Sequence, residues 1–321
     1  MTFDPDNPTA KAPLTVRLAS PRGFCAGVER AVRTVEDALA RFGAPIFVRH
    51  EIVHNRHVVR RLEAMGAVFV EDLARVPASR PVIFSAHGAP LSAHAEAGAR
   101  GLVTIDATCP LVTKVHNEVR RHLLLGRHVL LVGHRGHPEV IGTMGQAPAG
   151  AVTLIDTLAA AAAFAPPEGP LAYVTQTTLS VDDTAAIIAV LSGRFPAIAG
   201  PRKSDICYAT TNRQDAVKKI APGADFVLVV GSPASSNSNR LVDTALKAGA
   251  RAAMLVDDPD AFDLAVLEGA NVAGVTSGAS TPEELVERVL ARLAGRFALR
   301  IETQDDVRED VVFKQPLMLA S

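Results

Sequence analysis

Cysteine is scarce in this sequence, with three residues in 321. Three is an odd number and too few for a disulfide framework, so free, catalytic or metal-bound thiols are expected. Long apolar runs are also missing, and none reaches the roughly 20 residues that span a membrane. The first 13 residues contain acidic residues and prolines but no apolar core, so no signal peptide is expected. These absences predict a cytoplasmic protein that has no membrane partner.

An excess of charge of either sign is absent, since 33 Lys and Arg stand against 34 Asp and Glu, for a net charge of −1. Nucleic-acid-binding proteins usually have a basic excess, so no nucleic-acid partner is expected. The Gly-Lys dipeptide of a P-loop and the G-x-G-x-x-G dinucleotide fingerprint are both missing. Any electrons for redox chemistry must therefore come from outside the chain.

One pattern occurs three times along the chain: a cysteine precedes a helical segment, and two strand–loop–helix segments follow it. The intervals between the cysteines are 84 and 98 residues. Short β-branched runs that alternate with helices indicate parallel strands joined by right-handed crossovers. We therefore predict an α/β fold of three similar units with parallel sheets, at residues 14–108, 109–206 and 207–300, with terminal arms at 1–13 and 301–321.

Polar loops follow the predicted strands in all three units. Ligands of parallel sheets bind at the carboxyl ends of the strands, so a pseudo-threefold trefoil of the units would bring these loops to one central site. Most of the loop residues donate hydrogen bonds, which suits an anion. Ser, Thr and Asn before a helix are also common N-caps, and capping is compatible with binding. The residues are His54, His87, His137, Glu139, Thr177, Thr178, Ser235, Ser236, Asn237 and Ser280.

Each of Cys25, Cys109 and Cys207 precedes a predicted helix, where the helix dipole favours the thiolate that binds a metal. A buried free cysteine is the alternative for any one of them. The same position in all three units favours a metal, and the absence of a C-x-x-C pair argues against zinc. A 4Fe–4S cluster usually takes four thiolates. Three cysteines therefore predict one such cluster per chain, with one iron open to a substrate oxygen.

One segment imitates a different site, because His50, Glu51 and His54 spell the H-E-x-x-H signature of zinc proteases. That signature requires a helix, whereas this segment continues the strand-like IFVR. In a strand the two histidines would stand about 13 Å apart, too far to share a metal, so a zinc hydrolase is disfavoured. Four further histidines are expected to be solvated surface residues: His94, His116, His122 and His128.

The cysteines and polar loops lie in long and distinctive motifs: PRGFCAGV, VRHEIVHN, FSAHG, DATCPLVTKVH, GHPEVIGTMGQ, TQTTLSVDD, DICYATTNRQ, GSPASSNSNRL and VTSGASTP. With these motifs the sequence resembles the 4-hydroxy-3-methylbut-2-enyl diphosphate reductase family, which catalyses the last step of the non-mevalonate (MEP) isoprenoid pathway. The resemblance runs from about residue 21 to about residue 282. The residues before 14 and the tail FKQPLMLAS lie outside it.

The resemblance implies reduction of an allylic alcohol by two electrons and two protons, with loss of water, to isopentenyl and dimethylallyl diphosphates. It also implies a trefoil around a cluster held by the three cysteines, and a ferredoxin-type or flavodoxin-type electron donor. Glu139 would donate a proton, beside His137, and Thr177 would place the hydroxyl end. A non-enzymatic iron–sulfur sensor or carrier is the alternative, and it leaves Glu139 without a role. The implied diphosphate ligands are His54, His87, His137, Ser235, Ser236, Asn237 and Ser280.

Overall fold

A computed structural model describes residues 11–303 and 307–319, which form two compact units. Compact unit 1 contains the described parts of Met1–Cys25 and Tyr208–Asp310. Compact unit 2 contains Ala26–Cys207 and the described part of Val311–Ser321. Most of the predicted N-terminal arm lies outside the described residues. The predicted boundaries of three α/β units stay a prediction.

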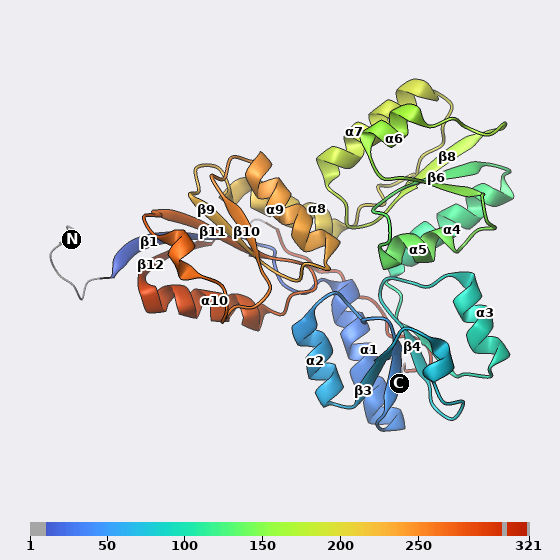
Figure 1. Cartoon of the computed structure of the whole chain (residues 1–321), viewed down its shortest axis with the longest axis horizontal. Coiled ribbons are helices and arrows are strands. Elements are labelled where there is room, and N and C mark those ends of the chain that lie inside the picture. Colours follow the sequence, from blue (N-terminus) through green and yellow to red (C-terminus); the bar gives the residue numbers. More distant parts are fainter. Residues whose placement is uncertain (1–10, 304–306, 320–321) are drawn as a thin grey trace. The chain divides into compact units, whose positions relative to one another are not determined.

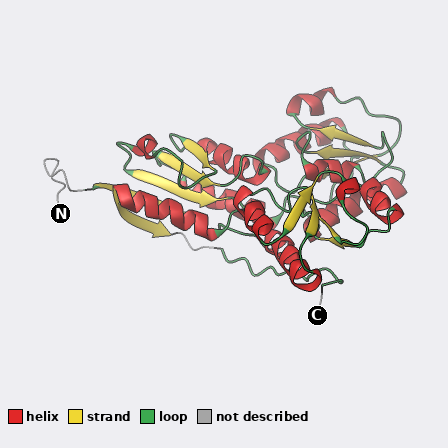
Figure 2. Ribbon diagram, turned by 60° about the horizontal axis from the view of Figure 1, so that its bottom comes forward, coloured by secondary structure: helices red, strands yellow, loops and turns green. Residues whose placement is uncertain are grey.

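Parallel sheets form the framework of the described chain, and helices flank their strands (Figure 1, Figure 2). In compact unit 1, sheet A has the strand order β10-β9-β11-β1-β12. In compact unit 2, sheet B has the order β3-β2-β4-β5 and sheet C the order β7-β6-β8. The strand pairs are parallel, as the alternation of strands and helices predicts. The strands are β1 (Ala12–Leu18), β2 (Ile46–Arg49), β3 (Ala67–Val70), β4 (Val82–Phe84), β5 (Thr104–Asp106), β6 (His128–Val132), β7 (Val152–Ile155), β8 (Leu171–Thr175), β9 (Phe226–Val230), β10 (Ala253–Val256), β11 (Val272–Ser277) and β12 (Phe297–Thr303).

The helices begin at residues that suit a helix start. Side chains of Asn55, Thr157 and Ser180 accept a backbone N–H of the first turn, and Pro110 and Pro138 occupy the first helical position. The helices are α1 (Ala26–Phe42), α2 (Arg56–Ala64), α3 (Leu91–Ala99), α4 (Pro110–Leu124), α5 (Pro138–Met144), α6 (Leu158–Ala163), α7 (Val181–Arg194), α8 (Tyr208–Ile220), α9 (Ser236–Lys247) and α10 (Glu283–Arg296), with the short 3₁₀ helices η1 (Leu73–Arg75) and η2 (Leu264–Leu267).

The sequence repeat reappears in the strand order of the sheets. Helices α1, α4 and α8 each follow a cysteine, and in each sheet the first strand after this helix lies between the next two strands of the chain. The resulting orders are β3-β2-β4, β7-β6-β8 and β10-β9-β11. The segment that precedes each cysteine in the chain pairs with the last strand of one of these three-strand groups. Before Cys109, β5 pairs with β4; before Cys207, Ala199 forms an isolated bridge to β8; and before Cys25, β1 pairs with β11. We grouped residues 14–18 of β1 with residues 19–108, but β1 pairs with β11 and β12, far along the chain.

Helices cover both faces of sheet A. Leu228 and Val230 of β9 pack with α10, whereas Val227 and Val229 pack with α8 and α9. Sheet C is covered in the same way, with α4 and α5 against one face and α6 and α7 against the other. Strands buried on both faces leave their carboxyl-terminal loops as the places for polar residues.

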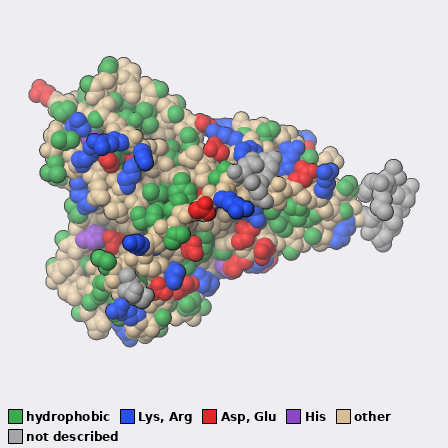
Figure 3. Space-filling view, turned by 180° about the vertical axis from the view of Figure 1, so that it is seen from behind, with side chains coloured by type: hydrophobic (Ala, Val, Ile, Leu, Met, Phe, Trp, Pro, Cys, Tyr) green, Lys and Arg blue, Asp and Glu red, His purple; other side chains and the backbone are tan. Residues whose placement is uncertain are grey.

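No helix of the described residues is both long enough and apolar enough to cross a membrane. Basic and acidic side chains are interspersed on the face drawn in Figure 3, in agreement with the small net charge of the chain.

Candidate active site

The three cysteines occupy equivalent places in the fold. Cys25 directly precedes α1, Cys109 precedes α4 and Cys207 precedes α8. All three are partly exposed and none forms a disulfide. Cys25 belongs to compact unit 1, whereas Cys109 and Cys207 belong to compact unit 2. Free, partly exposed thiols are the residue type that binds an iron–sulfur cluster, so these three residues fit the donors of such a cluster.

The backbone contact of each cysteine is also repeated. Each cysteine N–H donates to the carbonyl two residues beyond the end of a third strand, in the loops GAS, SAHG and TQTT. Each cysteine is therefore fastened to one of the polar loops that the sequence singles out. The three N–H···O contacts are Cys25 to Ala279 at 3.1 Å, Cys109 to Ala86 at 3.0 Å and Cys207 to Thr177 at 3.0 Å.

Three histidines from loops of compact unit 2 lie together. The ring centres of His54 and His87 are 4.1 Å apart, and His137 lies edge-on at 5.4 Å from His54 and 5.9 Å from His87. Burial lowers the pKa of His87 well below its usual value, and the neighbouring histidines lower it further. The same causes lower the pKa of His137 to about 3. At neutral pH these two imidazoles are therefore uncharged.

The tautomer of His137 follows from its contact with the helix that it caps. His137 Nδ1 accepts the backbone N–H of Glu139 at 3.1 Å. In a neutral imidazole the proton is then on Nε2, which becomes a hydrogen-bond donor. His137 thus presents a donor without a positive charge.

Glu139 is a buried acid beside this histidine group. Its side chain is held by Thr177, whose N–H donates to Oε1 at 2.6 Å and whose hydroxyl donates to Oε2 at 3.0 Å. The residue is 3% exposed, and burial raises its pKa to about 7, against the opposing effect of the two Thr177 bonds. A carboxyl with such a pKa exchanges its proton near neutral pH, as a general acid must.

In compact unit 1, Asn237 is linked to Cys25 through the backbone of Ala279. Asn237 Oδ1 accepts the N–H of Ala279 at 2.9 Å, and the carbonyl of that same residue accepts the N–H of Cys25. Ser235 caps α9 by accepting the N–H of Ser238 at 3.3 Å. Ser235, Asn237 and Ser280 are buried, whereas Ser236 is partly exposed. Capping therefore accounts for part of the role of Ser235 and leaves its hydroxyl proton available.

The H-E-x-x-H segment is not helical. Strand β2 ends at Arg49, and His50 has a positive φ of 61°. Its Nδ1 faces Glu71 at 2.5 Å, whereas His54 faces Glu51 and the histidine group. Within the described residues, no group of three or more His, Cys, Asp or Glu is arranged to hold a single metal ion.

Two histidines that we expected at the surface are buried. His116 and His122 are 6% and 0% exposed, because they share the inward face of α4 with Val112, Val115 and Val119. His116 lies under the SAHG loop, where Gly88 has a φ of +79°. A Cβ at Gly88 would come within 2.6 Å of the His116 ring, so this loop needs glycine for space as well as for conformation.

Other residues near the cysteines escaped the sequence analysis. Arg213 is fully buried and donates to the carbonyl of Gly23 at 2.8 Å, which supports the loop that leads to Cys25. Gln176 is buried beside Thr177 and accepts the N–H of His134 at 2.9 Å. Both lie inside the quoted motifs, in NRQ and TQTT, and that was the signal that could have found them.

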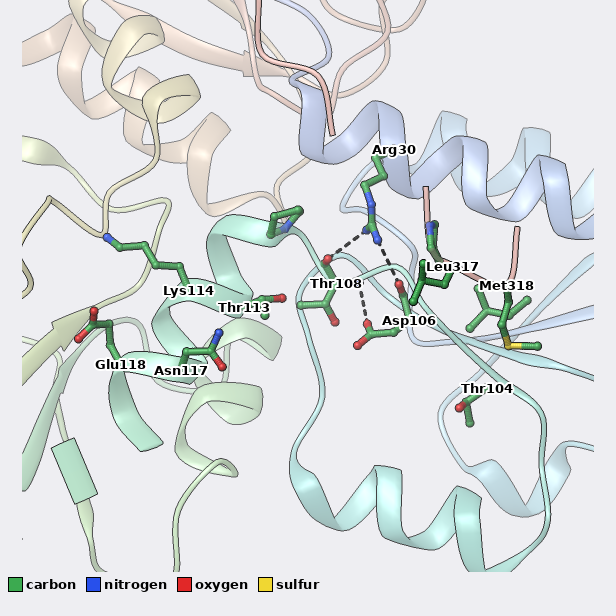
Figure 4. A pocket seen from close by; sticks show the side chains of 13 residues that line it. Arg30, Thr104, Asp106, Thr108, Thr113, Lys114, Asn117, Glu118, Leu317 and Met318 are labelled. Carbon is green, nitrogen blue, oxygen red and sulfur yellow. Dashed lines mark hydrogen bonds between the residues drawn. The ribbon is translucent and has the colours of Figure 1, made fainter. Parts of the chain in front are cut away.

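A cavity of about 640 Å³ is lined by Thr108 and Pro110, the two chain neighbours of Cys109, among other residues (Figure 4). Arg30 extends over it and donates to the carbonyls of Thr108 at 3.1 Å and Asp106 at 3.4 Å. The C-terminal residues 316–318 form part of its wall. None of the predicted site residues lines this cavity.

The parallel sheets, of which A and C are covered by helices on both faces, the buried acid Glu139 and the helix-start cysteines are together typical of an α/β enzyme. A family model described as LytB protein matches residues 16–294, and the chain belongs to this family.

Curated relatives match over nearly the full length. The chain is 59% identical over 313 residues to the 4-hydroxy-3-methylbut-2-enyl diphosphate reductase of Hyphomonas neptunium, covering 97% of this chain and 99% of the relative. It is 59% identical over 312 residues to the enzyme of the same name from Phenylobacterium zucineum, with the same coverage. The structure of the E-1-hydroxy-2-methyl-but-2-enyl-4-diphosphate reductase from Plasmodium falciparum matches with a TM-score of 0.90 at 38% identity, over 97% of each chain.

Proposed function

We propose that this chain reduces 4-hydroxy-3-methylbut-2-enyl diphosphate to isopentenyl and dimethylallyl diphosphates, as the last enzyme of the non-mevalonate pathway. The observation that carries the proposal is Glu139, a buried acid with a pKa of about 7 that Thr177 holds beside the neutral His137. A sensor or carrier of electrons has no use for such an acid. The 59% identity to two reductases of this name, over 97% of this chain, also supports the reductase.

Cys25, Cys109 and Cys207 would hold one 4Fe–4S cluster, around which the polar loops assemble as a trefoil. The support is that all three are partly exposed thiols at helix starts, with the same backbone contact to a polar loop. When bound, such a cluster would supply electrons and a Lewis-acidic iron to the reaction. Those electrons would come from a ferredoxin or flavodoxin type of donor, because the sequence contains neither the Gly-Lys dipeptide of a P-loop nor a G-x-G-x-x-G fingerprint.

The diphosphate would be bound by hydrogen-bond donors of the polar loops. His54, His87 and His137 would offer imidazole N–H groups, and the serines and Asn237 would offer hydroxyl and amide groups. The lowered pKa values of His87 and His137 leave these two donors uncharged in the free protein. A bound diphosphate would raise the pKa of these two imidazoles, so binding is expected to take up protons.

Glu139 would supply a proton at the reacting end of the substrate. The overall reaction takes two electrons and two protons; one proton leaves with the hydroxyl as water, and the other remains on carbon. The Thr177 N–H and hydroxyl fix both carboxyl oxygens, so the acid keeps one orientation when it changes charge. Its burial excludes the water that would otherwise compete for the proton.

An anaerobic assay tests this function. Purified anaerobically, the protein should be brown, contain iron and sulfide, and consume the allylic diphosphate when a one-electron reductant is added. A brown but inert protein would support the sensor or carrier, and a colourless protein with zinc would support the hydrolase.

His87→Ala is expected to weaken substrate binding about 10-fold to 100-fold. It removes one donor to a charged group, which is worth roughly 1.5 to 3 kcal/mol. The measurement is an anaerobic titration with the diphosphate, together with the iron content, which should not change. His128→Ala is the matched control, because His128 lies on β6 and contacts Thr153 rather than the histidine group. Equal affinity of His87→Ala and the wild type would remove His87 from the anion site.

A further inference from the structure

One lysine of helix α4 holds the segment that leads to Cys207. Lys114 Nζ donates to the carbonyl of Lys203 at 2.8 Å, to the carbonyl of Ser204 at 3.0 Å and to Asp205 Oδ1 at 3.0 Å. An ammonium group has three donors, and these three contacts use all of them. The same helix begins immediately after Cys109.

Asp205 joins this lysine to sheet C. Its side chain is 0% exposed, and its second oxygen, Oδ2, accepts the N–H of Thr175 at 3.0 Å, at the end of β8. Two residues later, the N–H of Cys207 donates to the carbonyl of Thr177. The segment from Lys203 to Cys207 is thus bound both to α4 and to the end of β8.

The links between the two cysteines are short and stiff. Lys114 is the fifth residue of α4, whose N-cap residue is Cys109, so the rise between the two is about 7.5 Å. Asp205 is two residues from Cys207. Loss of the cationic partner of a buried carboxylate strongly destabilises the folded state, so the contact between Asp205 and Lys114 should be maintained.

We propose that Lys114 and Asp205 are positioning residues that fix the Cys207 thiol relative to the Cys109 thiol. The inference rests on the proposed function, in which both thiols bind one rigid cluster. A pair of thiols that is already correctly spaced loses little freedom when the cluster binds, and it releases iron slowly. Neither residue is assigned a contact with the substrate.

The spacing can be measured without any cluster. In a Cys25→Ser chain only Cys109 and Cys207 remain as thiols, so nitroxide spin labels attach to these two positions. Dipolar coupling should give a narrow distance distribution for the apo chain, and Lys114→Met should broaden it. Arg61→Met is the matched control, because it removes an ion pair of 2.7 Å to Glu36 in the same compact unit, between α1 and α2. A folded Lys114→Met chain with the distribution of its parent would overturn the proposal.

The second measurement is the rate at which a chelator removes iron from the holoprotein. Lys114→Met is expected to release iron about tenfold faster than the wild type, because loss of a group that supports a metal ligand typically lowers metal affinity roughly 10-fold to 100-fold. Arg61→Met should release iron at the wild-type rate. If circular dichroism finds Lys114→Met unfolded, Lys114→Gln is measured instead, since it keeps a donor for the carbonyls.

The outcomes separate the two proposals. A wild-type chain that binds no iron contradicts the proposed cluster, whereas the spin-label distances still test whether Lys114 sets the thiol spacing. A wild-type chain that binds iron and releases it no more slowly than folded Lys114→Met contradicts the positioning role alone.

Discussion

Serine in place of Cys25, Cys109 or Cys207 is expected to remove most of the bound iron and nearly all turnover. A hydroxyl is a poor replacement for a thiolate at a cluster. The chain has three cysteines in total, so no spare thiol can take over. Iron and sulfide per chain, together with an anaerobic assay, measure the effect in each of the three variants.

The substitution is a sharp test because it leaves the backbone contacts unchanged. Each cysteine is held through its N–H, and serine has the same N–H, so the apo variants should have the circular dichroism of the wild type. Cys25 lies in the other compact unit from Cys109 and Cys207. Full iron and turnover in the Cys25→Ser variant would mean that compact unit 2 binds the metal alone. Full iron and turnover in the Cys109→Ser or the Cys207→Ser variant would equally contradict a cluster held by three cysteines.

Much of the fold and part of the site could be predicted because they depend on local patterns. Alternating strands and helices gave parallel sheets, and in parallel sheets the loops at the strand ends share one edge. His54 and His87 follow neighbouring strands, β2 and β4, and their rings stack at 4.1 Å. The pairing of Glu139 with Thr177 has the same origin, since they follow β6 and β8.

The features that the sequence did not reveal depend on partners far along the chain. Nothing in β1 itself indicates that it pairs with β11, more than 250 residues away. The burial of His116 depends on which face of α4 meets the SAHG loop. The ion pair of Lys114 Nζ with Asp205 Oδ1, at 3.0 Å, joins two residues that are 91 positions apart in the chain. A buried charge needs a partner of opposite charge, and the sequence of one segment does not show which distant residue will be that partner.

Glu139→Gln is expected to lower turnover about a hundredfold or more, while iron content and substrate affinity stay near the wild-type values. Glutamine keeps the size of the side chain and can still accept the N–H of Thr177, but it carries no acidic proton. Loss of a general acid typically has an effect of this size. Steady-state kinetics with excess reductant measures turnover, and an anaerobic titration measures affinity.

The pKa of Glu139 adds a pH signature. Because the acid acts in its protonated form, wild-type turnover should fall as pH rises through about 7, where the carboxyl loses its proton. The residual turnover of Glu139→Gln should lack this ionisation. Thr177→Val is the companion variant, since it removes the hydroxyl bond to Oε2 but keeps the N–H bond to Oε1. It should raise the pKa of Glu139 and move the fall in turnover to higher pH.

Stability provides a readout of the same carboxyl that does not involve the substrate. Burial raises the folded-state pKa from 4.5 to about 7, so the folded chain holds this proton more tightly than the unfolded chain does. The contribution of Glu139 to stability is therefore complete below pH 4.5, and it is lost as pH rises to about 7. Above pH 7 the free energy of unfolding is lower by about 3 kcal/mol than below pH 4.5. The Glu139→Gln variant does not show this loss, because glutamine does not ionise. Compact unit 2 of the Glu139→Gln apoprotein should accordingly resist denaturant better than that of the wild type at pH 8, and the gain should shrink towards pH 5.

The two readouts together identify what Glu139 does. A variant that is more stable at pH 8 and a hundredfold slower has lost an acid that the fold keeps at the expense of stability, as expected for a catalytic group. A variant that is slower but shows no pH-dependent gain would mean that the carboxyl is not desolvated, and that glutamine acts by disturbing Thr177. Near wild-type turnover with excess reductant would remove Glu139 from the proton transfer. The proton would then have to come from His137, through the Nε2–H that its contact with the Glu139 backbone specifies, or from a water held by Thr177.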